Sequence, residues 1–235
     1  MIIGVVGCGG TGGWVANLLA KMLGEGDTLV LIDKDKFEKK NMDRQLNCKV
    51  GMNKASALAK ALANSRCVID SLEEWFTASM NKQYDCLFCC ADNHRARIAC
   101  LDYADNNRCT AYIGGNEYSS FDACAYRAFM SGHEELDPRV RFPEMLTSTE
   151  GDPLSPSCTG EVLESSPQLA LANMQTATAL CRLWYTWEFV VPKLGFGFNL
   201  NAAEHEDADE MYRLSKTIEV RISGNDNRLS VERLQ

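Results

Sequence analysis

The chain has 235 residues, of which 46% are apolar, and its net charge of −8 gives an isoelectric point near 5.0. This composition is typical of a globular protein with one large core or two small ones, and its acidity argues against broad nucleic-acid binding. No apolar run reaches the roughly 20 residues that span a bilayer, and no leader pattern precedes the first strand. We therefore expect a cytoplasmic protein whose eleven cysteines are reduced thiols.

The first third of the chain predicts the opening unit of a doubly wound sheet. An apolar strand over 2–7 leads through a glycine-rich turn into a helix over 11–23, and a second strand follows over 28–33. The next expected elements are a helix over 54–63, strands over 66–70, 85–91 and 109–113, helices over 73–81 and 95–106, and an antiparallel strand over 119–129. This order predicts an α/β, Rossmann-like doubly wound sheet whose parallel N-terminal part continues into antiparallel strands.

The second half of the chain is less regular. Residues 131–157 carry four prolines and many charges, which predicts a long surface loop. A long apolar helix is expected over 168–189, and two weak strands over 217–223 and 228–233 form a final hairpin. We predict one main domain over 1–190 and a C-terminal extension over 191–235 that packs on it.

The glycine turn is the first candidate binding site. Gly7, Gly9 and Gly12 satisfy G-x-G-x-x-G, a pattern that lets a tight turn present backbone N–H groups to phosphate at a helix start. Asp33 ends the second strand, where an acid can bind ribose hydroxyls. These residues alone point to NAD as readily as to ATP, so an NAD(P)- or FAD-dependent oxidoreductase stays open.

Four further sequence features help to decide between NAD, FAD and ATP as the bound nucleotide. They are LIDKDKFEKKNMDRQ, VGMNK, CCADN and the extra glycine, Gly10, in the turn. Their order and spacing resemble the ThiF/MoeB family of adenylating enzymes, which is related to ubiquitin-activating enzymes. The resemblance covers about residues 2–115 closely and 150–190 loosely.

The resemblance implies a role for each motif residue. Asp33 would take the ribose, Asp92 would hold Mg²⁺, and a cationic pair would neutralise the charge that develops at the α-phosphate of ATP. Arg44 and Lys54 could instead be ordinary solvated charges, and Asp92 could be a helix cap. The implied nucleotide-binding set is Gly7, Gly9, Gly10, Gly12, Asp33, Asn41, Arg44, Gln45, Lys54 and Asn93.

Cys158 is the candidate thiol. It lies in a polar segment where a thiolate can form and be reached, and the family carries a cysteine in or near this place, before an apolar helix with a Met-Gln or Leu-Gln pair. Met174-Gln175 matches that pair. Cys158 would capture the activated acyl group as a thioester or take part in a persulfide step, or it is an incidental loop cysteine.

Three departures from the family pattern qualify the resemblance. The sequence begins at the first strand, so we expect the family arginine that reaches the neighbouring subunit's ATP to be missing, and Arg95 or Arg97 could replace it. Only Cys86 and Cys89 form a C-x-x-C pair, so we expect no structural zinc. At this length we expect no separate cysteine or carrier-recruiting domain.

The resemblance implies a minimal adenylyltransferase that uses ATP and Mg²⁺. It would adenylate the C-terminal carboxylate of a ubiquitin-like or sulfur-carrier protein with a Gly-Gly-type tail, with Arg44, Lys54, Asp92 and Cys158 as catalytic residues. The loop over 131–157 would cover the incoming tail, and a homodimer is expected. A non-catalytic ATP-binding scaffold is the alternative from another class.

Overall fold

The computed structural model describes residues 1–116, 120–127, 137–147, 167–190, 220–225 and 228–233. All eight described strands join one sheet, in the order β3-β2-β1-β4-β5-β6-β7-β8. β1 to β5 run parallel, and each contact from β5 to β8 is antiparallel, which confirms the expected doubly wound sheet with an antiparallel end. The strands are β1 (Ile2–Val6), β2 (Thr28–Ile32), β3 (Val68–Leu72), β4 (Cys86–Cys89), β5 (Thr110–Asn116), β6 (Ser120–Arg127), β7 (Val220–Asn225) and β8 (Arg228–Arg233).

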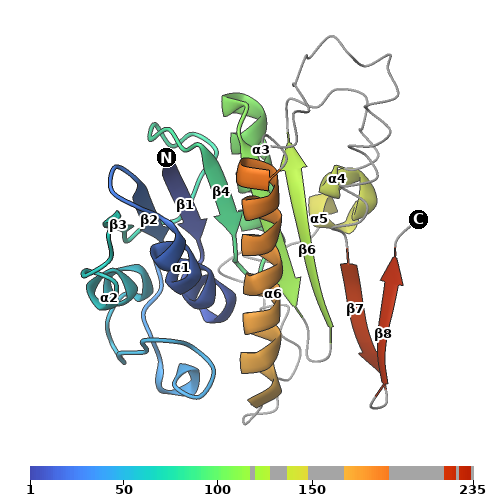
Figure 1. The fold of residues 1–235 in the computed structure, drawn as a ribbon, viewed down its shortest axis with the longest axis horizontal. Coiled ribbons are helices and arrows are strands. Elements are labelled where there is room, and N and C mark those ends of the chain that lie inside the picture. Colours follow the sequence, from blue (N-terminus) through green and yellow to red (C-terminus); the bar gives the residue numbers. More distant parts are fainter. Residues whose placement is uncertain (117–119, 128–136, 148–166, 191–219, 226–227, 234–235) are drawn as a thin grey trace.

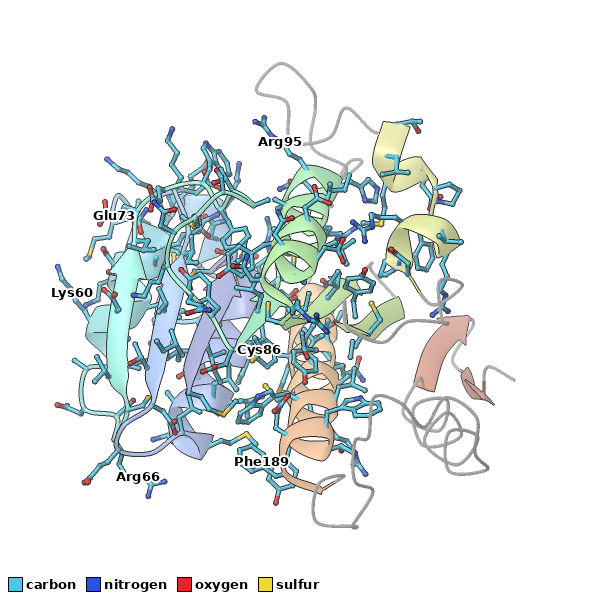
Figure 2. The ribbon with its side chains drawn as sticks, turned by 90° about the horizontal axis from the view of Figure 1, so that it is seen from above. Lys60, Arg66, Glu73, Cys86, Arg95 and Phe189 are labelled. Atoms are coloured by element: carbon cyan, nitrogen blue, oxygen red, sulfur yellow. The ribbon has the colours of Figure 1, made fainter. Side chains whose placement is uncertain are left out.

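Helices cover both faces of the parallel part. α1 (Gly10–Met22) and α6 (Pro167–Tyr185) lie side by side on one face, together with α2 (Lys54–Ala61), while α3 (His94–Asn107) covers the other (Figure 1). Figure 2, seen from above, shows α3 and α6 on opposite sides of the sheet. A π-helical turn (Thr186–Val190) continues α6, and a short 3₁₀ helix (Lys39–Asn41) lies between β2 and α2.

Each face of the sheet has its own apolar core. On the face of α1 and α6, fully buried Val15 and Leu19 pack with Leu180 and Trp184 against the strands. On the face of α3, Leu101 and Tyr103 pack against the opposite side of the same strands. Because β1 and β4 have no exposed side chain except Ile2, both faces of the central strands are covered, as expected for parallel strands.

The strand order reverses between β1 and β4, and this reversal positions the site. α1 leaves the carboxyl end of β1 toward one face, whereas α3 leaves the end of β4 toward the other. The two connections therefore diverge and open a crevice at that edge of the sheet, which is where ligands bind in open α/β folds. The glycine turn and the Asp92-Asn93 pair lie at these two strand ends.

One expected helix is wrong. Residues 73–81 form no helix; they run as an irregular segment from β3 back across the edge of the sheet to β4. The segment is tied down by Phe76, which is 8% exposed and packs in edge and tilted contacts with the rings of Tyr84 and Tyr103. The connection must span the width of two strands, and burying this one ring outweighs a weak local helical preference.

The loop expected over 131–157 contains regular structure where it is described. α4 (Pro138–Arg141) begins with a proline at its first position and is capped by the Asp137 side chain, which accepts from the Arg139 N–H at 2.8 Å. α5 (Glu144–Thr147) follows and buries Met145 against the core on the α3 side. Pro138 and Pro143, two of the four prolines that suggested a loop, therefore start or precede helical turns.

Arg139 holds this segment on the molecule. Its guanidinium forms ion pairs of 2.7–2.9 Å with Asp102 and Asp105 of α3 and with Asp137, and it contacts the ring of Tyr126. The carboxylates keep the pKa of the guanidinium above its ordinary value. One cation thus pairs with three carboxylates and joins α4, α3 and β6.

Replacing Arg139 by alanine is expected to lower the free energy of unfolding by about 1–2 kcal/mol, since three partly exposed carboxylates lose their common partner. Amide hydrogen exchange over 137–147 is expected to speed up more than exchange in β1 or β4. Arg66→Ala, at an exposed position with no described ion pair, is the control. Equal, small effects of the two variants would contradict the role assigned to Arg139.

No helix in the described part of the chain is both long and apolar enough to cross a membrane. The ten cysteines within the described ranges form no disulfide, and Cys86 and Cys89 are buried in β4.

Candidate functional site

A cavity of about 670 Å³ opens at the carboxyl ends of β1 and β4. This volume lies within the roughly 300–1,000 Å³ of small-molecule sites. Its walls come from the glycine turn, the residues after β2, the start of α2, the segment 74–78, the first turns of α3, and single residues of β5 and α6. Residues spread over most of the described chain therefore meet in one crevice.

The glycine turn forms one wall and exposes the start of α1. Gly7 has a φ of +86°, which side-chain-bearing residues rarely adopt, and a Cβ there would lie 2.8 Å from the backbone N of Ala91. Gly9 caps α1 without any side-chain hydrogen bond, and within the described ranges no other side chain bonds to the first backbone N–H groups of the helix. Gly9, Gly10 and Thr11 line the cavity, and the open helix start is suited to an anion.

Gly12 does not line the cavity but allows the turn to close. A Cβ on Gly12 would lie 1.8 Å from the carbonyl oxygen of Gly7. The third glycine of the motif therefore serves the close packing of α1 against the turn, while the first glycines face the ligand space.

Asp33 ties the second strand to this turn. Its Oδ2 accepts from the backbone N–H of Cys8 at 2.7 Å and its Oδ1 accepts from that of Asp35 at 2.8 Å. Burial raises the pKa of the Asp33 carboxyl, while the nearby Lys54 ammonium and these two N–H groups oppose the rise. Each oxygen keeps a lone pair for a ligand hydroxyl, so the carboxylate can order the turn and bind at once.

Two of the predicted cations face the same cavity. Lys54 begins α2, its side chain is 15% exposed, and its ammonium lies 3.4 Å from Asp35. Arg44 lines the cavity without a described acidic partner. Asn53 fixes the start of α2 against the strand end, because its amide donates to the Asp33 carbonyl at 2.7 Å and its oxygen caps the Ser56 N–H. Lys34 and Arg95 also reach the cavity.

Asn41 and Gln45 differ in their position relative to the cavity: Gln45 lines it and Asn41 does not. Asn41 is 4% exposed, does not line the cavity, and its Oδ1 accepts from the Glu38 N–H at 2.8 Å, so it closes the 3₁₀ turn that precedes Arg44. Gln45 lines the cavity beside Gly9, and its Oε1 is buried with no hydrogen-bond partner in the described residues. Gln45 is therefore the one with hydrogen-bonding capacity left for a ligand.

The end of β4 supplies the carboxylate. Asp92 is exposed on the cavity wall, and the cap of α3 is its neighbour Asn93, whose Oδ1 accepts from the Ala96 N–H at 2.9 Å. Asp92 is thus not the helix cap that the sequence left as its alternative role. Arg95 lines the cavity, whereas Arg97 does not and lies 3.3 Å from the His94 ring nitrogen.

Part of the cavity lining is apolar and comes from Trp75, Phe76 and Ala78 together with Ile98 and Ala99 of α3. Trp75 is 57% exposed, the centre of its ring lies 5.9 Å from the Lys34 ammonium, and Phe76 is buried. A flat, apolar group such as a nucleobase fits this chemistry. Sequence reasoning missed these residues because it placed 73–81 in a short helix and assigned it no role in the site.

Sequence reasoning also missed a polar cluster of Thr11, Asn116 and Asn173, all of which line the cavity; Thr11 and Asn173 are buried and Asn116 is partly buried. The Met174-Gln175 pair was singled out instead, but Met174 is 37% exposed and lies outside the cavity lining. A signal was present, because Asn173 lies on the apolar stripe of α6 that continues through Ala177 and Leu180. Cys158 lies outside the described residues, as does most of the loop over 131–157.

The ThiF family profile matches residues 1–125 of the chain. Over 123 residues the chain is 29% identical to a tRNA threonylcarbamoyladenosine dehydratase of Haemophilus influenzae (strain ATCC 51907 / DSM 11121 / KW20 / Rd). That alignment covers 47% of this chain and 46% of the relative, so the chain matches about half the length of this curated protein.

Solved structures share the fold over more of the chain. Escherichia coli MccB with ATP aligns with a TM-score of 0.58 at 17% identity, covering 99% of this chain and 63% of MccB. The E. coli tRNA N6-threonylcarbamoyladenosine dehydratase TcdA aligns with a TM-score of 0.50 at 19% identity, covering 79% of this chain and 87% of TcdA. These likenesses show a common architecture.

Proposed function

The chain belongs to the ThiF family, and we propose that it is an adenylyltransferase that activates a carboxylate with ATP. The observation that carries the proposal is one cavity with an open helix start, Asp33, Arg44, Lys54 and Asp92 on its walls. The substrate that we propose is the C-terminal carboxylate of a ubiquitin-like or sulfur-carrier protein with a Gly-Gly-type tail. The chain's resemblance to a family with ATP-bound members supports the nucleotide assignment.

In the proposed step, a carboxylate oxygen of the carrier tail attacks the α-phosphorus of ATP. The new bond gives an acyl adenylate, and the bond from the α-phosphorus to the bridging oxygen breaks, so that pyrophosphate leaves with that electron pair. A carboxylate is already ionised near neutral pH, so no general base is needed. Arg44 and Lys54 would neutralise the phosphate oxygens, and Asp33 would fix the ribose.

Magnesium belongs to the proposal through Asp92. An exposed carboxylate on the cavity wall suits Mg²⁺, which commonly takes one or two carboxylates and completes its shell with phosphate and water oxygens. When bound, the ion would offset phosphate charge. Cys158 would then take the acyl group from the adenylate as a thioester and release AMP.

A second substrate class has its own support. The 29% identical relative is described as acting on a threonylcarbamoyl adenosine of tRNA, and threonine also carries a carboxylate. The same adenylation chemistry would serve a carboxylate on a modified nucleoside. Binding to tRNA would have to overcome the net charge of −8, which disfavours a polyanion.

ATP–pyrophosphate exchange tests the proposal directly. Exchange is expected in the presence of Mg²⁺ and a carrier ending in Gly-Gly, to be lost in Asp92→Ala, and to persist in Cys158→Ala because the thiol acts after adenylation. Asp43→Ala removes an exposed carboxylate outside the cavity and is the matched control. Threonylcarbamoylated tRNA replaces the carrier in a parallel assay.

Bound ATP with no exchange for any carboxylate would contradict the enzyme proposal and favour a scaffold. Tight NADH binding without ATP binding would instead favour an oxidoreductase. Exchange that survives Asp92→Ala unchanged would remove Asp92 from the proposed metal site.

A further inference from the structure

The polar cluster joins three distant parts of the chain beneath the glycine turn. Thr11 comes from the first turn of α1, Asn116 from the end of β5, and Asn173 from α6. The Oδ1 of Asn173 accepts from the Thr11 hydroxyl at 3.1 Å and from the Asn116 Nδ2 at 3.0 Å. The Thr11 hydroxyl has a single proton and also lies 3.3 Å from Asn116 Oδ1, so it donates to one of the two oxygens at a time, while the Asn116 Nδ2 holds the oxygen side of the Asn173 carboxamide.

The other side of the Asn173 carboxamide is an unused donor. Asn173 is 4% exposed, and none of the described residues accepts a hydrogen bond from its Nδ2. A Cβ built on Gly10 would lie 2.1 Å from this nitrogen, so the NH₂ group lies directly over the start of α1, on the cavity wall. Because Asn173 lines the cavity, a ligand bound there can supply the acceptor that no described residue supplies.

The neighbouring groups define what that ligand atom must be. The uncapped backbone N–H groups at Gly10 and Thr11 are also donors, and the helix start carries a partial positive charge. A group that meets the Asn173 NH₂ and these N–H groups together has several acceptor atoms and negative charge. A phosphate oxygen has this chemistry, whereas a ribose hydroxyl or a nucleobase brings no charge.

We propose that Asn173 is a phosphate-binding residue of the nucleotide site, with its NH₂ donating to a phosphate oxygen at the start of α1, and that Thr11 and Asn116 are positioning residues that orient it. The inference rests on the proposed nucleotide-binding function. It also explains Gly10, because any side chain there would displace the Asn173 amide. The phosphate site is complete only when α6 is packed against α1, so the second half of the chain contributes to it.

Asn173→Asp tests the proposal, because the substitution keeps the shape and the accepting oxygen but replaces the free donor by a charged acceptor. Affinity for ATP is expected to fall at least tenfold, whereas affinity for adenosine stays within twofold, both measured by calorimetry or by competition. Asn81→Asp adds the same charge at an exposed position outside the cavity and is expected to change neither.

A purely structural role for Asn173 would weaken ATP and adenosine by the same factor and would overturn the inference, as would an unchanged ATP affinity. If Asn173→Asp fails to fold, Asn173→Ala serves instead, because it removes the donor without adding charge. The loss of affinity is expected to be smaller for this variant, and it must again affect ATP and not adenosine. A wild-type chain that binds no ATP would contradict the proposed function itself, which separates the two failures.

Discussion

Replacing Gly12 by alanine is expected to weaken ATP binding at least 100-fold and to destabilise the fold. The added Cβ would lie 1.8 Å from the carbonyl oxygen of Gly7, a backbone atom that no side-chain rotation can move away. Either α1 shifts away from β1 or the turn opens, and both displace the N–H groups at the helix start. Overpacking of this kind typically costs about 1–3 kcal/mol, and we expect the upper end of that range. Thermal unfolding and calorimetric titration with ATP measure the two effects.

Gly13→Ala is the matched control for this prediction, one residue further along the same helix. A Cβ there would meet only Leu46, at an ordinary contact distance of 3.6 Å. Alanine also loses less conformational freedom than glycine in a helix, so the control is expected to leave stability unchanged or raise it by about 0.4–1 kcal/mol. Equal losses in both variants would show that the first helical turn is sensitive to any substitution, and the close approach at Gly12 would not be the cause.

Removing either cation that faces the cavity is expected to lower ATP–pyrophosphate exchange at least 100-fold. Lys54 is held at the start of α2 with a largely buried side chain, and Arg44 follows the 3₁₀ turn that Asn41 closes. Both would meet the triphosphate, where charge increases as pyrophosphate departs, so Lys54→Ala and Arg44→Ala each remove stabilisation of the transition state. Exchange rates at saturating ATP separate this effect from weaker ATP binding.

Lys40→Ala removes a lysine of the same segment and is the control. Lys40 is 67% exposed, pairs with Glu38 and does not line the cavity, so exchange is expected to stay within twofold of wild type. Lys54→Arg keeps the charge but changes its reach, and partial activity would show that position as well as charge matters. If Arg44→Ala and Lys54→Ala retained full exchange, the phosphates would have to be neutralised by Lys34 and Arg95, which also reach the cavity.

The parts of the fold that follow local rules could be predicted from the sequence. Strand, glycine turn, helix and Asp33 succeed one another along about thirty residues, each with its own local pattern, and β1, α1 and β2 lie where these patterns indicate. The expected antiparallel strand is β6, which pairs with β5 from Thr110 to Asn116. The helix expected over 73–81 failed because the path of that segment is set by the distance between β3 and β4 and by the pocket for Phe76, neither of which is a local property.

The residues of the proposed nucleotide site also divide into those that the sequence predicted and those that only the tertiary structure placed. Gly7, Asp33, Arg44 and Lys54 belong to motifs whose spacing along the chain is characteristic, so the sequence alone predicted that they act together on a phosphate-bearing ligand. Only the tertiary structure decided that Asn41 closes a turn away from the cavity, that Arg95 faces the cavity while Arg97 does not, and that Asn116 and Asn173 meet Thr11. The physical reason is that the orientation of a side chain toward the cavity, and above all a contact between residues more than 100 positions apart such as Thr11 and Asn173, depends on how helices and strands pack, whereas the glycine turn is encoded within a few neighbouring residues.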